Sequence, residues 1–334
     1  NGFKLPDELE AQMENLISTG EVEGRRPTAE GIGKAIRIDD AAGRYIEFLK
    51  QAVPKGVNLS GLKIVLDCAH GAGYRVAPAV LTELGAQVIA VGITPDGKNI
   101  NAGCGSMHPE LMCRLVVEHK ADVGLALDGD ADRVIMSDEK GSVVDGDYIL
   151  AILAQHLFKK GELNKGTVVS TVMSNLGFDM AMQSMGIKVV RTSVGDRYVI
   201  QSMKTSGYNL GGEQSGHIIF LDHNTTGDGI LAGLKVLSIL KEGGRPLSMA
   251  KQVLTPFPQI LTNVKVKQKK DFSQIPAIAT SIRKIEQELG NRGRLVLRYS
   301  GTEMMARIMI EGEHQARLKS LADGLAEEII RHLG

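Results

Sequence analysis

The chain opens with helical patterns and then alternates between short apolar runs and amphipathic segments. Residues 7–18 place Leu9, Met13 and Leu16 on one face of a predicted helix, and residues 41–53 predict a second helix. Three continuous apolar runs are typical of buried strands: 63–69, 87–93 and 121–127. Two helical patterns separate these runs: 74–85 and 108–120. This order predicts crossover helices between parallel strands.

The alternation then starts again. Two further apolar runs predict strands: 167–173 and 188–194. Four helical patterns surround them: 148–161, 175–186, 197–207 and 227–244. Gly161 is expected to end the first of these helices. The sequence therefore predicts two consecutive α/β units of about 100 residues each.

The pattern changes near Phe257, where Pro256 and Pro258 indicate a linker. Beyond it, the predicted order is strand, helix, strand, strand, helix: 259–267, 278–290, 294–300, 306–312 and 318–333. Two adjacent strands between helices predict a small α+β domain. The fold class is thus α/β, with two α/β domains followed by an α+β domain. The expected boundaries are 41–143, 144–255 and 256–334, preceded by a segment over 1–40.

Composition narrows the classes of function. The 39 basic and 39 acidic side chains cancel, which disfavours a nucleic-acid binder with a basic surface. No apolar run approaches the roughly 18–20 residues that span a bilayer, and no signal peptide opens the sequence. The three cysteines lack metal-ligand spacing and are interpreted as reduced thiols. A cytoplasmic protein without nucleic-acid or membrane partners is expected.

An acidic loop follows the predicted strand 121–127. Asp128, Asp130 and Asp132 recur at every second position, so they can converge only around a positive charge. Oxygen ligands without His or Cys favour Mg²⁺ over Zn²⁺. A Ca²⁺-binding EF-hand is disfavoured because Arg133 occupies the sixth position, where that loop needs glycine. The alternative is a solvated acidic turn.

A glycine-rich loop lies over residues 211–217. Its glycines permit close approach of a ligand to the backbone. Glu213 and Ser215 are hydrogen-bonding groups suited to sugar hydroxyls. Taken alone, such a polar turn before a strand is more often only a turn.

A third polar loop lies between the two adjacent strands of the last domain. Its candidate phosphate ligands are Arg298, Ser300, Gly301, Thr302 and Arg307. Arginine makes bidentate contacts with phosphate, and hydroxyl and backbone N–H groups complete an oxyanion cradle. The loop lacks the P-loop pattern. The alternative is a β-hairpin with incidental polar residues.

The three loops, in this order and at these separations, resemble the metal, sugar and phosphate loops of the α-D-phosphohexomutase superfamily. The resemblance covers residues 1–334. Four stretches are similar to its bacterial phosphoglucosamine mutase branch in particular: Asp40–Tyr45, Val194–Val199, Thr225–Gly229 and Phe257–Gln259.

The resemblance implies an isomerase that interconverts glucosamine 6-phosphate and glucosamine 1-phosphate and feeds amino-sugar nucleotide and cell-wall synthesis. A phosphoserine would donate its phosphoryl group, and a bisphosphorylated sugar would serve as intermediate and activator. The resemblance also implies one Mg²⁺ per chain on Asp128, Asp130 and Asp132, with Arg133 near the phosphoserine. The implied substrate is a hexosamine phosphate, and a homodimer is left open.

Two departures from the superfamily pattern affect these expectations, and a third, at Met304, is smaller. The Ser-His-Asn-Pro loop that carries the phosphoserine does not occur in the 334 residues, which begin with Asn1. We expect that loop upstream, with 1–40 as the remnant of the first domain and a linker, and we expect the chain alone to be inactive. The superfamily has a similar Asn-Gly-x-Lys stretch with a functional lysine shortly after the serine loop. Lys4 is not assigned that role, because Asn1–Lys4 here continues directly into a segment that comes later in phosphoglucosamine mutases. Met304 stands where the superfamily commonly has proline.

Three alternatives remain at this point. A dehalogenase-type phosphatase shares the Asp-x-Asp pattern but needs Thr or Val where this chain has Asp132. A phosphoglucomutase or phosphomannomutase would differ only in the hexose. A non-catalytic sugar-phosphate-binding module would keep the three loops without a nucleophile.

Overall fold

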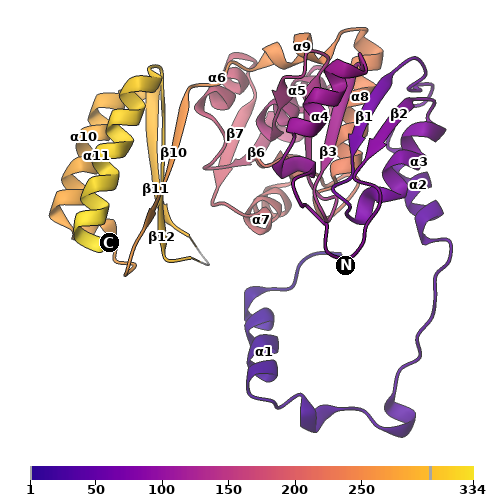
Figure 1. The fold of residues 1–334 in the computed structure, drawn as a ribbon, viewed down its shortest axis with the longest axis horizontal. Coiled ribbons are helices and arrows are strands. Elements are labelled where there is room, and N and C mark those ends of the chain that lie inside the picture. The colour runs from indigo at the N-terminus through magenta and orange to yellow at the C-terminus, as the bar shows by residue number, and fades with distance from the viewer. Residues whose placement is uncertain (1, 301–302) are drawn as a thin grey trace.

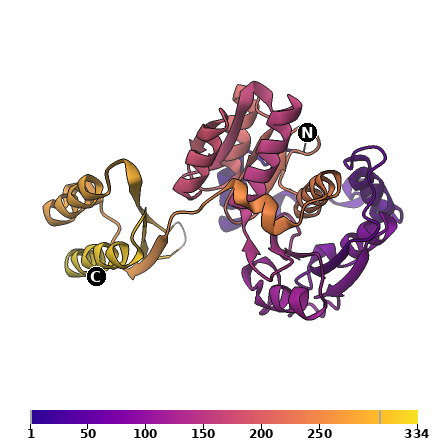
Figure 2. The ribbon, with the colours of Figure 1, turned by 90° about the horizontal axis from the view of Figure 1, so that it is seen from above.

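The computed structural model describes residues 2–300 and 303–334, with the backbone alone at residue 291. Three sheets follow one another along the chain. Figure 1 shows the third sheet lying apart from the other two, and Figure 2 shows it joined to them by one linker segment. This arrangement confirms the predicted class of two α/β units followed by a small α+β unit.

The first sheet has the strand order β2-β1-β3-β4-β5. Its strands are β1 (Lys63–Asp67), β2 (Gln87–Val91), β3 (Val123–Leu127), β4 (Val134–Asp138) and β5 (Val143–Val144). Its helices are α2 (Ala41–Gln51), α3 (Val76–Glu83) and α4 (Glu110–Glu118). β3 lies in the middle of the sheet and is buried along its whole length, as its uninterrupted apolar run predicts.

The parallel arrangement expected for the first three strands is confirmed, and the two strands that follow them run the other way. β1, β2 and β3 are parallel, but β4 is antiparallel to β3, and β5 is antiparallel to β4. Only residues 128–133 connect β3 to β4, whereas a parallel crossover needs about a dozen residues or more. The acidic loop is therefore a hairpin connection.

The second sheet repeats this design with the order β7-β6-β8-β9. Its strands are β6 (Thr167–Thr171), β7 (Lys188–Thr192), β8 (Leu210–Gly212) and β9 (Ile218–Phe220). Its helices are α5 (Gly146–Lys160), α6 (Leu176–Ser184), α7 (Asp196–Ser206), α8 (Gly229–Gly243) and α9 (Leu247–Ala250). β9 is again antiparallel to its neighbour. Gly161 ends α5 in the left-handed conformation, as expected.

The first two units share one hydrophobic core. The same cluster contains Leu66 and Leu125 from the first sheet and Val168 and Phe178 from the second unit. α8 joins them, because its apolar residues pack into this cluster along most of the helix. The two α/β units therefore support each other's loops.

The third sheet is antiparallel, with the order β10-β12-β11. Its elements are β10 (Gln259–Lys265), α10 (Pro276–Leu289), β11 (Gly293–Tyr299), β12 (Met305–Gly312) and α11 (Gln315–Leu333). Both helices cover one face of the sheet, where Ala306, Ile308 and Ile310 enter a separate core. Because side chains alternate along a strand, Arg307 and Met309 lie on the opposite face.

The N-terminal segment forms α1 (Asp7–Ser18) within a chain loop that extends away from the α/β units (Figure 1). The predicted helix is correct, but its apolar face is not buried: Leu9 is 44% exposed and Met13 is 52% exposed. Within the described ranges, the model contains no helix that combines the length and the apolar character needed to span a membrane.

Candidate functional site

All three polar loops are tight connections between antiparallel strands. Residues 128–133 join β3 to β4, and residues 213–217 join β8 to β9. The third loop joins β11 to β12 and is described at Ser300 and from Glu303 onward. The third loop thus connects two antiparallel strands, and this connection is compatible with an anion site.

The acidic loop is held in shape by its neighbours. Asp128 accepts a hydrogen bond at Oδ1 from the Arg133 N–H, at 3.2 Å. Ala131 adopts a φ of 61°, a left-handed conformation that costs energy for a residue with a Cβ. Gly71 packs directly on this loop, since a Cβ there would lie 2.3 Å from the Gly129 carbonyl oxygen. The strained loop conformation is therefore enforced by packing.

The aspartates of this loop are unequal. Burial, together with a hydrogen bond to Asp132, raises the pKa of Asp128 to about 6. A hydrogen bond from His217 lowers the pKa of Asp132 to about 2. Asp130 is exposed. Among the described residues, no group of three or more His, Cys, Asp or Glu side chains is gathered closely enough to hold a metal. Asp128 and Asp132 therefore lie close enough for each to influence the pKa of the other.

His217 connects the acidic loop to the glycine-rich loop. Its Nδ1 lies 3.2 Å from Asp132 Oδ2, and its Nε2 accepts a hydrogen bond from the Gly227 N–H at 3.1 Å. In this geometry Nδ1 carries the proton that points at Asp132. A backbone bridge between Arg133 and His217 joins the same two loops. No role was predicted for His217, although its place in the glycine-rich motif was a usable signal.

Arg133 lies beside the aspartates. Its Nε is 3.9 Å from Asp128 Oδ2 and 4.0 Å from Asp132 Oδ1. This Nε is buried and has no hydrogen-bond partner among the described residues, while the side chain as a whole is 41% exposed. A guanidinium in this position is available to an anionic group that approaches the acidic loop.

The two predicted sugar ligands differ in their surroundings. Glu213 accepts a hydrogen bond at Oε1 from the Gly195 N–H, at 3.0 Å, at the start of α7. Ser215 is exposed at the tip of its loop. Asp196, also at the start of α7, lies 3.8 Å from His217 Nε2 and pairs with Lys4 at 2.5 Å. Asp196 and Lys4 are neighbours of the site to which no role had been given.

The predicted phosphate arginines face each other across two strands. Arg298 on β11 and Arg307 on β12 are direct partners in the antiparallel register. Both line a cavity of about 160 Å³, which Met173 of the second unit also lines. Burial, together with the charge of Arg307, lowers the pKa of Arg298. Like charges placed directly opposite each other destabilise a sheet, so this arrangement favours an anion between them.

The remaining predicted phosphate ligands surround this pair. Ser300 is buried, its Oγ accepts a hydrogen bond from the Glu303 N–H at 3.3 Å, and its carbonyl oxygen accepts one from Lys269 Nζ at 2.6 Å. Gly301 and Thr302 lie outside the described residues. Arg307 donates to Glu303 at 3.2 Å, but its Nε is buried without a partner in the described part of the chain.

Three family models match the chain in succession. They are phosphoglucomutase/phosphomannomutase alpha/beta/alpha domain II over residues 43–141, alpha/beta/alpha domain III over residues 145–257, and the C-terminal domain over residues 261–328. The chain belongs to the phosphoglucomutase/phosphomannomutase family. The resemblance inferred from the three loops is thereby confirmed.

Individual relatives refine this family assignment. The phosphoglucosamine mutase of Pelobacter propionicus is 54% identical over 334 residues, which are 100% of this chain and 74% of that protein. A phosphoglucomutase/phosphomannomutase family protein of Burkholderia thailandensis has a similar fold, with a TM-score of 0.76 at 20% identity over 96% of this chain and 69% of its own. The N-acetylphosphoglucosamine mutase of Aspergillus fumigatus, solved in complex with GlcNAc-6P and magnesium, also has a similar fold. Its TM-score is 0.69 at 20% identity, and the match covers 86% of this chain and 69% of that one. Family members of this kind are isomerases and are generally Mg²⁺ dependent.

Proposed function

We propose that this chain carries the metal, sugar and phosphate loops of a phosphoglucosamine mutase, which interconverts glucosamine 6-phosphate and glucosamine 1-phosphate. The observation that carries the proposal is the 54% identity to the Pelobacter propionicus enzyme over the whole chain. The three loops fit this reaction because phosphoryl transfer depends on positioning and on charge neutralisation.

The arginine pair holds the phosphate that does not react. Arg298 and Arg307 offer two guanidinium groups to one anion, and Ser300, Gly301 and Thr302 complete the loop around it. Glu213 and Ser215 bind hydroxyl groups of the ring. A sugar anchored in this way at one phosphate can present either its 1-position or its 6-position to the acidic loop.

The acidic loop receives the reacting phosphate. Asp128, Asp130 and Asp132 would converge on one Mg²⁺ when it binds, although the three side chains are not gathered around a common point in this structure, and their hard oxygen donors suit the ion. When bound, the ion supplies positive charge that neutralises the phosphoryl group. Arg133 adds a second positive charge from the protein, with a buried Nε that is without a partner in the described residues.

The reaction conserves its phosphoryl groups. A phosphoserine gives its phosphoryl group to the free hydroxyl of the sugar phosphate, which forms a bisphosphorylated sugar. This intermediate turns around and returns the other phosphoryl group to the serine oxygen. The net change is an isomerisation without release of phosphate, so the partner required by this chain is a hexosamine phosphate.

We expect a mutase assembled from this chain and a segment with a Ser-His-Asn-Pro loop to prefer amino sugars. Glu213 within the sugar loop and Asp196 beside it carry carboxylates that favour a ligand with an ammonium group. A preference in kcat/KM of at least about tenfold for glucosamine 1-phosphate over glucose 1-phosphate corresponds to about 1.4 kcal/mol. A coupled mutase assay with both substrates measures it. A preference for glucose would assign the protein to the phosphoglucomutase branch instead.

A further inference from the structure

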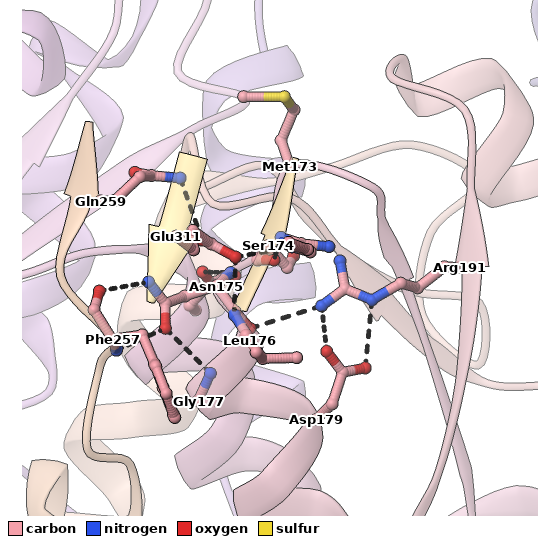
Figure 3. A network of polar contacts seen from close by, with 12 residues as sticks. Met173, Ser174, Asn175, Leu176, Gly177, Asp179, Arg191, Phe257, Gln259 and Glu311 are labelled. Atoms are coloured by element: carbon pink, nitrogen blue, oxygen red, sulfur yellow. Dashed lines mark hydrogen bonds and ion pairs between the residues drawn. The ribbon is translucent and has the colours of Figure 1, made fainter. Parts of the chain in front are cut away.

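A second polar cluster lies away from the three loops, where the third sheet meets the start of α6. Figure 3 shows this cluster, which contains Asn175, Leu176, Phe257 and Glu311. Glu311 is fully buried, and Asn175 is 4% exposed. Polar groups buried at such a junction cost free energy unless they are paired, so their hydrogen bonds define how the two units meet.

Glu311 of β12 binds two units at once. It accepts hydrogen bonds at Oε2 from the Leu176 N–H, at 3.2 Å, and from Arg294 Nε, at 2.6 Å. Arg294 of β11 also donates to the carbonyl oxygen of Ser174. The third sheet therefore caps the first turn of α6 with the Glu311 carboxylate, and the Arg294 guanidinium binds Ser174, two residues before the helix begins. The contact at Leu176 satisfies one of the backbone N–H groups that the first turn of α6 leaves free.

Asn175 fixes the linker to the same place. Its Oδ1 accepts hydrogen bonds from the Gly177 N–H at 2.9 Å and the Phe257 N–H at 2.8 Å, and its Nδ2 donates to the Phe257 carbonyl oxygen at 3.0 Å. The linker passes so close that a Cβ at Gly177 would lie 2.2 Å from the Thr255 carbonyl oxygen. The linker and the sheet are thus both attached to the first turn of α6.

The same two strands carry the phosphate arginines. In the register of β11 and β12, Arg294 faces Glu311, Val296 faces Met309, and Arg298 faces Arg307. Side chains two and four residues apart on a strand share a face, so all three pairs lie on the face away from α10 and α11. The Arg294–Glu311 pair is four residues from Arg298, about 13 Å along a strand.

The segment at the start of α6 completes this connection. Met173 directly precedes Ser174 and Asn175, the residues that bind the third sheet and the linker. Met173 also lines the 160 Å³ cavity together with Arg298 and Arg307. A change in the contact at Glu311 would therefore move both walls of the phosphate cavity relative to each other.

We propose that Glu311, Arg294 and Asn175 form an interdomain clamp that acts as a set of positioning residues for the phosphate cavity. The clamp holds the third sheet in one orientation on α6, and so it fixes the distance from Arg298 and Arg307 to the acidic loop. This inference rests on the proposed function, because it assigns the cavity to the substrate phosphate. Positioning matters in phosphoryl transfer, where a misplacement of about 1 Å can cost a hundredfold in rate.

The test compares Glu311→Ala with the wild-type chain in two measurements. Titration calorimetry gives the Kd for glucosamine 6-phosphate, and hydrogen exchange of the peptide over residues 172–180 reports the contact at Leu176. If the competent orientation falls to about a tenth of the population, the apparent Kd rises about tenfold. Exchange over 172–180 is expected to accelerate, and saturating ligand is expected to restore part of the protection.

Matched variants separate positioning from general damage. Glu313→Ala removes a carboxylate just beyond β12 that pairs with Arg292 at the surface, and it is expected to leave both measurements unchanged. Arg298→Ala is expected to weaken binding without changing exchange over 172–180. If Glu311→Ala fails to fold, Arg294→Lys is the second variant. Lysine retains the positive charge but lacks the guanidinium that donates to both Glu311 and Ser174. Arg294→Lys is expected to raise the Kd and to accelerate exchange over 172–180 as well.

The outcomes distinguish the two proposals. A folded Glu311→Ala or Arg294→Lys chain with wild-type Kd and wild-type exchange would overturn the clamp while leaving the proposed function intact. A wild-type chain that binds no hexose phosphate would contradict the proposed function. A higher Kd together with faster exchange in the clamp variants, and neither change in Glu313→Ala, supports the inference.

Discussion

Replacing Arg298 with alanine is expected to weaken the binding of hexose phosphates by about ten- to a hundredfold. Hydrogen bonds to charged groups contribute about 1.5–3 kcal/mol, and each 1.4 kcal/mol is a tenfold change in Kd. Arg298 faces Arg307 across the strands, and both line the 160 Å³ cavity. The substitution therefore removes one of the two guanidinium groups that would bind the phosphate.

The same substitution is expected to leave the ligand-free chain at least as stable as the wild type. Without a bound anion, the two facing guanidinium groups repel each other, and the variant loses that repulsion. Titration calorimetry with glucosamine 6-phosphate and urea unfolding measure the two effects. Arg331→Ala, which removes a surface arginine paired with Glu328 on α11, is the matched control. An unchanged affinity in Arg298→Ala would show that the cavity does not hold the phosphate.

Loss of any one aspartate of the acidic loop is expected to weaken divalent metal binding by at least about tenfold. Even residues that only support metal ligands typically cost ten- to a hundredfold when replaced, so a ligand should cost no less. Asp128→Asn and Asp130→Ala are the informative variants, because Asp128 is half-buried beside Asp132 whereas Asp130 is exposed.

Titration with Mn²⁺, followed by electron paramagnetic resonance, measures metal binding without any need for turnover. Asp323→Ala removes an exposed carboxylate on α11 and controls for loss of charge. If Asp128→Asn loses the metal but Asp130→Ala binds it like the wild type, Asp130 is not a ligand. If both variants bind Mn²⁺ like the wild type, the metal assignment is wrong.

The periodic pattern of the sequence predicted most elements of the fold because local signals agree with the final structure. The apolar run of β3 is buried as predicted, and Gly161 ends α5 in the conformation expected of a terminal glycine. The direction of β4 was not predicted, since it follows from the shortness of the 128–133 connection and not from apolar spacing. α1 forms as predicted, yet its apolar face remains exposed.

The candidate site was predictable only where its residues form short motifs. The aspartates, the glycine-rich loop and the arginine loop are each contiguous or nearly so. His217 escaped assignment because its partners Asp132 and Gly227 come from other segments. The clamp has no local signature at all: Arg294 and Ser174 are 120 residues apart, and Glu311 and Leu176 are 135 apart. Such pairs appear only when the units are placed against each other.

Under the proposed function, three loops from three sheets bind one hexosamine phosphate together. Hydrogen exchange of this chain, with and without saturating glucosamine 6-phosphate, tests it most directly. We expect the ligand to slow exchange in all three loops together, over 128–133, 213–217 and 298–307, and to leave exchange in α11 unchanged. Slower exchange confined to one loop, or found instead at the cavity of about 520 Å³ between α6 and the linker, would contradict it.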